Sequence, residues 1–131
     1  MIFPDTSAIY ALADTRDPNH QEATHLSRQA LAQGEELLVH NYVLIEAVAL
    51  LQRRLGVGSA LAMLRNSEAF RVHWVNPKVH REAVVILEDR GLRGLSLVDC
   101  VSFVVMRYHE VVSALAFDSD FQREGFARFS A

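Results

Sequence analysis

Four acidic residues stand in otherwise apolar parts of the chain. Glu46 and Asp99 are each the only charged residue in a stretch of ten or more residues, and Asp5 and Asp118 each follow a short apolar run. An isolated carboxylate is costly to bury unless a base, a proton or a metal ion neutralises it. Since none of the four segments supplies a basic partner, a shared cation would account for all four acids.

The types of side chain available as ligands indicate which metal ion the site would bind. Cys100 is the only cysteine and the six histidines show no zinc-type pair, so the acids would form a hard oxygen site. Such donors favour Mg²⁺ or Mn²⁺ over zinc. Three of the four acids also have a structural interpretation: Asp99 completes a capping box with Ser96, Asp118 ends a strand, and Asp5 precedes a helix. Glu46, in the middle of an apolar helix, is the hardest to explain in this way. The metal site is therefore predicted from the four acids together.

Short apolar runs alternate with longer helical patterns, and these elements must position the acids. The predicted strands cover residues 2–3, 37–40, 72–75, 111–117 and 127–129. The first predicted helix is capped by Thr6 or Ser7 and ends at residue 13, and the others cover residues 20–33, 42–55, 59–70, 77–90 and 97–108. Asn41, Asn76 and Ser96 are the predicted caps of the helices that begin at residues 42, 77 and 97. Strands separated by helices pair in parallel, so we expect an α/β fold, a three-layer α/β/α sandwich with a mainly parallel, Rossmann-like sheet. Ligands collect at the carboxyl ends of such strands, where Asp5 and Asp118 would lie.

Length and composition predict one soluble domain over residues 1–131. The chain has a net charge of −3 and is 50% hydrophobic, which suits a single core. One cysteine cannot form an internal disulfide, and no segment resembles a signal peptide or a membrane span. We therefore expect a cytoplasmic protein. The slightly negative net charge argues against a protein that coats nucleic acids or other polyanions non-specifically.

Four segments resemble the PIN-domain family, and more narrowly the small VapC-like toxins of toxin-antitoxin pairs. They are residues 2–9 (IFPDTSAI), 42–47 (YVLIEA), 95–101 (LSLVDCV) and 117–121 (FDSDF). Their order and spacing agree with the family along essentially the whole chain. Ala116 is a departure, because many relatives carry Thr or Ser two residues before the fourth acid.

The resemblance implies a PIN-like sheet with its acids at one edge, binding Mg²⁺ or Mn²⁺, and endoribonuclease activity. It also implies RNA as substrate, a cognate antitoxin as partner and a homodimer. By position, the acidic quartet corresponds to Asp5, Glu46, Asp99 and Asp118, the frequent extra acid to Asp120, and the small hydroxyl residue near the metal to Ser7, with Thr6 beside it in a supporting role. Either Asp118 or Asp120 would be the fourth metal ligand.

Hydrolysis of a phosphodiester requires an activated water and neutralisation of charge, which metal ions provide. The quartet would hold the metal, with Glu46 binding a second ion or orienting the water. Candidate phosphate contacts are Arg53 and Arg54, at the end of the Glu46 helix, and Arg90 and Arg93, before Asp99. The same arginines could instead satisfy helix ends.

Two other functions fit less of the sequence. A non-catalytic PIN-like scaffold for RNA or protein would have no reason to keep four costly acids. A phosphotransfer enzyme with Asp5 as nucleophile would need a second Asp at Ser7, and its lysine would follow a strand, whereas Lys78 starts a helix. Trp74 and Tyr42 are expected in the core, and the apolar segment 55–64 is a candidate dimer contact.

Overall fold

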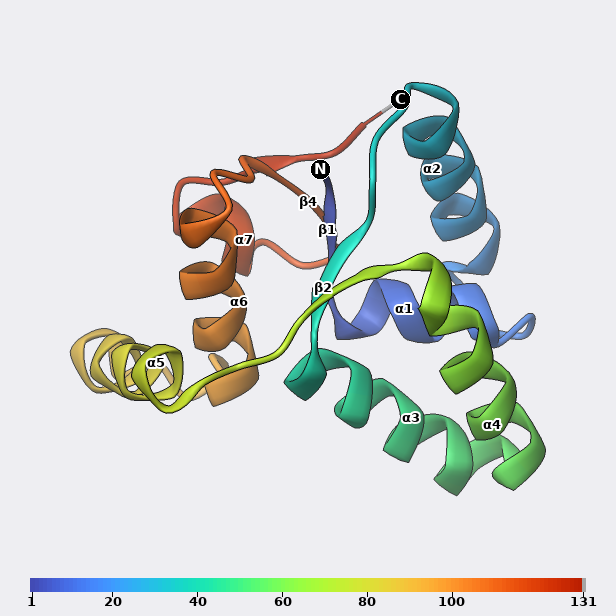
Figure 1. Ribbon diagram of the computed structural model, residues 1–131, viewed down its shortest axis with the longest axis horizontal. Helices are drawn as coiled ribbons and strands as arrows, with labels where there is room; N and C mark the ends of the chain where they lie inside the picture. Colours follow the sequence, from blue (N-terminus) through green and yellow to red (C-terminus); the bar gives the residue numbers. More distant parts are fainter. Residues whose placement is uncertain (131) are drawn as a thin grey trace.

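Short strands alternate with helices in the computed structural model, which describes residues 1–130 (Figure 1). The strands are β1 (Phe3–Pro4), β2 (Leu38–His40), β3 (Arg71–His73), β4 (Ser113–Leu115) and β5 (Ala127–Arg128). The helices are α1 (Thr6–Ala13), α2 (His20–Ala32), α3 (Asn41–Leu55), α4 (Val57–Asn66), α5 (Pro77–Arg90), α6 (Leu97–Tyr108) and α7 (Asp120–Arg123), with a 3-10 turn at Ser67–Ala69. This order confirms the predicted α/β class.

The strands form a parallel sheet. One part has the order β1-β4-β5 and the other pairs β2 with β3, and every pairing is parallel. A parallel bridge between Ile2 and Leu37 joins the two parts. The strand order is therefore β3-β2-β1-β4-β5, with β1 in the centre. The carboxyl ends of all five strands lie at one edge, which brings the residues after β1 and β4 together.

Pro4 explains why β1 pairs so briefly with β2. The Ile2 N–H donates to Glu36 O at 2.9 Å, and the Leu38 N–H donates to Ile2 O at 2.9 Å. The next donor on this side of β1 would be residue 4, and proline has no N–H. On the other side the ladder continues, because the Asp5 N–H donates to Leu115 O at 3.1 Å. The central strand thus releases β2 early and ends at Asp5.

Helices cover both faces of the sheet, as predicted for a three-layer sandwich. Figure 1 shows α5 and α6 on one side of the strands and α1, α2 and α4 on the other. α6 packs against α5 and reaches α3 and β2, while α1 packs against α2 and α3. Residues Cys100 to Met106 of α6 are all buried, so this helix forms the centre of the main core. None of the helices in residues 1–130 has the length and apolar character of a membrane span.

Several predicted element boundaries were wrong. The structure gives the cap of α1 to Asp5 instead of Thr6 or Ser7, and the cap of α3 to His40 instead of Asn41. Helix α4 begins two residues earlier than expected, at Val57, because Gly56 (φ 93°) allows a sharp turn directly after α3. Except for β1, the strands are also shorter than the apolar runs that predicted them. These runs continue into loops that contain both buried residues, such as Ala116, and exposed ones, such as Val112.

Two predictions about burial are contradicted. The apolar sequence around Glu46 predicts a largely buried helix, yet α3 buries only Val43, Leu44, Ala47 and Leu51, and Glu46 is exposed. The apolar residue Ile45 beside it is also exposed, at 61%. Trp74 was expected in the core and is 72% exposed, because it follows β3 at the sheet edge. An apolar sequence therefore marked a surface here as well as a core.

Candidate active site

Asp5 lies where the central strand meets the first helix. Its Oδ1 accepts hydrogen bonds from the Ala8 N–H at 2.9 Å, which caps α1, and from the Ser7 hydroxyl at 2.7 Å. The residue is 5% exposed. Burial raises the pKa of Asp5 to about 6, the hydrogen bonds from Ser7 and Ala8 oppose that rise, and the negative charges of Asp118 and Asp99 add to it.

Asp99 lies in the first turn of α6. The predicted capping box is confirmed: the Ser96 N–H donates to Asp99 Oδ2 at 3.0 Å, and the Asp99 N–H donates to Ser96 Oγ at 3.1 Å. Partial burial raises the pKa of Asp99, hydrogen bonds from Ser96 lower it, and the charges of Asp118 and Asp120 raise it. The structural and the functional interpretations of Asp99 are thus compatible.

Asp118 and Asp120 lie beyond the carboxyl end of β4. The Asp120 N–H donates to Asp118 Oδ1 at 3.0 Å, which fixes the turn into α7. Arg123 forms an ion pair with Asp120 Oδ1 at 3.2 Å and donates to Ser119 Oγ at 2.8 Å. The two acids line a pocket of about 330 Å³, together with Leu92, Arg93, Gly94, Leu95 and Arg123.

The four aspartates form one electrostatic group. Asp118 and Asp99 both act on Asp5, and Asp118 and Asp120 both act on Asp99. Each of the four carboxylates accepts its hydrogen bonds or ion pair on one oxygen only. Within residues 1–130, no donor contacts the second oxygen. Hard oxygen donors that repel one another and have open lone pairs fit a divalent cation such as Mg²⁺. Within residues 1–130, however, no three acidic, histidine or cysteine side chains already stand close enough to hold an ion.

The remaining residues of the predicted site differ in how they are placed. Ser7 contacts Asp5 directly, as the hydroxyl near the first acid. Thr6 is the first residue of α1 and is half-buried. Glu46 lies on the exposed face of α3, in its second turn after the end of β2, and the structure gives it no fixed partner among residues 1–130. Its role in the site therefore stays a prediction.

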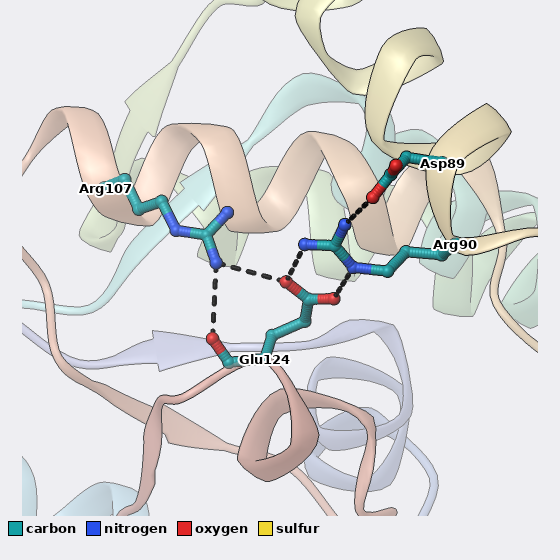
Figure 2. A network of polar contacts seen from close by, with 4 residues as sticks. All are labelled: Asp89, Arg90, Arg107 and Glu124. Atoms are coloured by element: carbon teal, nitrogen blue, oxygen red, sulfur yellow. Dashed lines mark hydrogen bonds and ion pairs between the residues drawn. The ribbon is translucent and has the colours of Figure 1, made fainter.

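The four candidate arginines differ in exposure and in the groups that they contact. Arg53 and Arg54 are exposed in the last turn of α3, and the Arg54 guanidinium lies 5.1 Å from the centre of the Tyr10 ring. Arg93 lines the pocket that contains Asp118 and Asp120. Arg90 is held by Glu124 and Asp89, so its guanidinium is already paired with two carboxylates (Figure 2).

His40 is a structural residue of this region that the sequence did not reveal. Its Nδ1 accepts from the Val43 N–H at 3.2 Å, and its Nε2 donates to Ser102 Oγ at 2.8 Å. Ser102 in turn donates to Val98 O at 3.0 Å. His40 thus joins the start of the Glu46 helix to the helix that carries Asp99. Complete burial, with a smaller effect of the His73 charge, lowers the pKa of His40 to about 3.

The arrangement of acids at one edge of a parallel sheet agrees with a comparison against protein families. The model of the PIN domain matches residues 2–127. The chain belongs to the PIN-domain family. The resemblance seen in the four sequence segments is thereby confirmed.

Individual PIN-domain proteins give a narrower assignment. The chain is 37% identical over 128 residues to the 23S rRNA-specific endonuclease VapC20 from two strains of Mycobacterium tuberculosis, covering 96% of this chain and 95% of the relative. The crystal structure of Mycobacterium tuberculosis VapC20, described as a sarcin-ricin loop cleaving toxin, matches with a TM-score of 0.84 and 35% identity. That match covers 97% of each chain. The predicted likeness to VapC toxins is therefore confirmed for sequence and fold.

Proposed function

We propose that this PIN-domain protein is a metal-dependent endoribonuclease, the toxin of a toxin-antitoxin pair, that cuts 23S rRNA in the sarcin-ricin loop. The observation that carries the proposal is the group of aspartates at the sheet edge, each with an oxygen open to a cation. The choice of RNA follows the relatives, whose names specify 23S rRNA and the sarcin-ricin loop. Ribosomal RNA as substrate would place the activity in the cytoplasm.

We propose Mg²⁺ or Mn²⁺ as the cofactor, held by Asp5, Asp99 and Asp118, with Asp120 as the alternative to Asp118. Glu46 would bind a second ion or orient the attacking water. When bound, such an ion lowers the pKa of a water molecule and neutralises charge on the phosphate. The pKa values of Asp5 and Asp99 are raised mainly by burial and further by the charges of neighbouring aspartates, and a bound cation would offset both effects.

The chain's own residues would prepare the acids and hold the RNA. Ser7 and the Ala8 N–H fix the Asp5 carboxylate in one orientation. Arg93, at the rim of the pocket beside Asp118, would contact a phosphate next to the bond that is cut. Arg53 and Arg54 would contact phosphates farther along the strand.

The test is cleavage of a 23S rRNA fragment that contains the sarcin-ricin loop. We expect one new pair of ends in Mn²⁺ or Mg²⁺, and none in chelator or in an RNA of scrambled loop sequence. Mapping of the ends gives the cleaved bond and shows whether the product ends in phosphate or hydroxyl. Cleavage that is equal in chelator would refute metal dependence, and cleavage of both RNAs alike would refute the substrate.

Variants separate catalysis from folding. Asp5→Asn and Glu46→Gln keep side-chain volume and remove a ligand charge, so both should abolish cleavage without altering the circular dichroism spectrum. Asp17→Asn is a matched control, because Asp17 also accepts a local backbone hydrogen bond, from the Asn19 N–H at 2.8 Å, but lies in the loop after α1. It should cleave like wild type. Full activity of Asp5→Asn would rule out the proposed site.

Two partners are part of the proposal. The cognate antitoxin is expected for a VapC-like toxin. A homodimer is expected through the apolar segment 55–64, where Leu55, Val57, Leu61 and Leu64 are each more than 40% exposed. Light scattering of the purified protein measures the dimer directly.

A further inference from the structure

The Glu124 carboxylate lies between two helices and binds an arginine from each (Figure 2). Arg90, the last residue of α5, donates from Nε to Oε1 at 2.5 Å and from Nη2 to Oε2 at 3.0 Å. Arg107, in the last turn of α6, donates from Nη2 to Oε2 at 3.1 Å and to the Glu124 carbonyl at 3.2 Å. Asp89 completes the network with a contact to Arg90.

This network differs from an ordinary surface ion pair. The Glu124 side chain is 9% exposed, against 35% for Arg90 and 46% for Arg107. Both carboxylate oxygens are engaged, and the two parallel bonds from Arg90 fix the orientation as well as the distance. Glu124 therefore has no free oxygen for a metal ion, and its carboxylate serves to connect chain segments.

The segments that it connects are the ones that carry the acids. Glu124 directly follows α7, so it ends the segment that begins at Asp118. Arg90 directly precedes the loop with Arg93 that leads to Asp99, and Arg107 lies on the same helix as Asp99. A single carboxylate thus ties the Asp118 segment to both ends of the Asp99 segment.

Apolar contacts hold the same segment from below. Phe121 is buried, with its ring centre 6.0 Å from that of Phe3 and 5.2 Å from that of Phe103. Phe126 stacks on Phe103 at 5.8 Å, and the Arg107 guanidinium lies over the Phe126 ring at 5.2 Å. These contacts anchor α7 to the core, but apolar packing is not directional. The bonds of Glu124 add a fixed orientation relative to α5 and α6.

We propose that Glu124 is a positioning residue, which through Arg90 and Arg107 holds the Asp118–Asp120 turn against the Asp99 helix so that these acids can share a cation. The proposal rests on the proposed metal-dependent function. It also gives Arg90 a structural role in place of the predicted phosphate contact, since its guanidinium is already bound to two acids.

The test compares Glu124→Gln with Glu22→Gln. Both variants add one positive unit of net charge, and Glu22 forms an ion pair at 3.8 Å with Arg128, which is neither of the arginines that Glu124 binds. We expect Glu124→Gln to bind Mn²⁺ about 10-fold more weakly by calorimetry, the lower end of the loss found when groups that orient metal ligands are removed. In metal-free protein, amide hydrogen exchange should increase in residues 118–124. RNA binding in chelator should equal that of Glu22→Gln.

Cleavage distinguishes positioning from general stability. The rate of Glu124→Gln at saturating RNA should be lower in dilute Mn²⁺ and recover as Mn²⁺ is raised. Because bound metal also stabilises a fold by mass action, circular dichroism in chelator must show that the variant is already folded before Mn²⁺ is added. If Glu124→Gln does not fold, Arg107→Gln, which removes one of the two arginines, should show the same effects to a smaller extent.

If Glu124→Gln binds Mn²⁺ as tightly as wild type and its residues 118–124 exchange at the wild-type rate, the positioning role is overturned. A wild-type protein that neither binds Mn²⁺ nor cleaves RNA would instead overturn the proposed function, and the metal-positioning role with it. The two failures are therefore distinguishable from the wild-type measurements alone.

Discussion

Protonation of His40 should destabilise this protein at mildly acidic pH. The folded state holds the imidazole neutral, because Nδ1 must accept from the Val43 N–H while Nε2 donates to Ser102. A proton on Nδ1 would remove the acceptor that caps α3 and place a charge in a fully buried position. The folded pKa is about 3, against about 6.5 for histidine in an unfolded chain.

The size of the effect follows from the difference between these pKa values. A group whose folded pKa is lower than its unfolded pKa, and whose charged form is the acid, stabilises the fold above pH 6.5 and loses that stabilisation as pH falls toward 3. At pH 5 the unfolded histidine is almost fully protonated and the folded one is not, which costs about 2 kcal/mol. At pH 4 the cost reaches about 3 kcal/mol. That is a large fraction of the stability of a typical domain.

Urea denaturation at pH 7 and pH 5 measures the net change in stability. Asp5, whose pKa is raised to about 6, contributes in the opposite direction, so the His40 contribution is obtained by comparison with a variant. Circular dichroism is the suitable signal, since the only tryptophan, Trp74, is already 72% exposed in the folded state. His40→Asn removes the titrating group but keeps an oxygen that can cap α3. It should be less stable than wild type at pH 7, yet lose about 2 kcal/mol less between pH 7 and pH 5. The matched control is His25→Asn, on the exposed side of α2, which should keep the wild-type pH dependence. Equal pH dependence of His40→Asn and wild type would refute the reasoning.

Two further predictions concern the site. Asp118→Asn should melt at or above the wild-type temperature in chelator, since it relieves repulsion of Asp5 and Asp99 and keeps an oxygen for the Asp120 N–H, whereas point mutations usually destabilise by about 1 kcal/mol. In Mn²⁺ wild type should gain several degrees and the variant little, and equal gains would remove Asp118 from the site. Replacing Arg53 and Arg54 with Ala should reduce the salt dependence of RNA binding by about 0.7 in logarithmic slope per lost phosphate contact, measured by fluorescence anisotropy. An unchanged slope would assign both arginines to the helix end.

Local signals in the sequence predicted the elements well. The capping box of Ser96 and Asp99 and the start of α5 at Asn76 and Pro77 were confirmed, because these patterns act within one helical turn. The order of strands and helices, and with it the sheet edge that gathers the acids, follows from the alternation of short and long apolar patterns. The extra helix α7 was missed, since its four residues suggest only a turn.

Contacts between distant segments could not be predicted. His40 finds Ser102 62 residues away, and Glu124 finds Arg90 34 residues away, and no local pattern announces either pair. The exposure of Glu46 was misjudged for a related reason. Hydrophobicity measures what a helix can bury, whereas the neighbouring helices decide which face is covered, and α3 is covered on one face only. The acids of the candidate site could therefore be predicted from the sequence, but the residues that position them, such as His40 and Glu124, could not.

The pairing of β1 with β4 also sets the order of events during synthesis. Phe3 pairs with Ala114 and Pro4 with Leu115, so the central strand leaves the ribosome long before the strand with which it pairs. Pairing across such a separation is slow to form. A nascent chain that stops before Asp118 carries three of the quartet's acids without the strand and turn that complete the site. The ribosome that makes this protein would therefore meet a finished nuclease only after the segment that carries Asp118 has been made and paired.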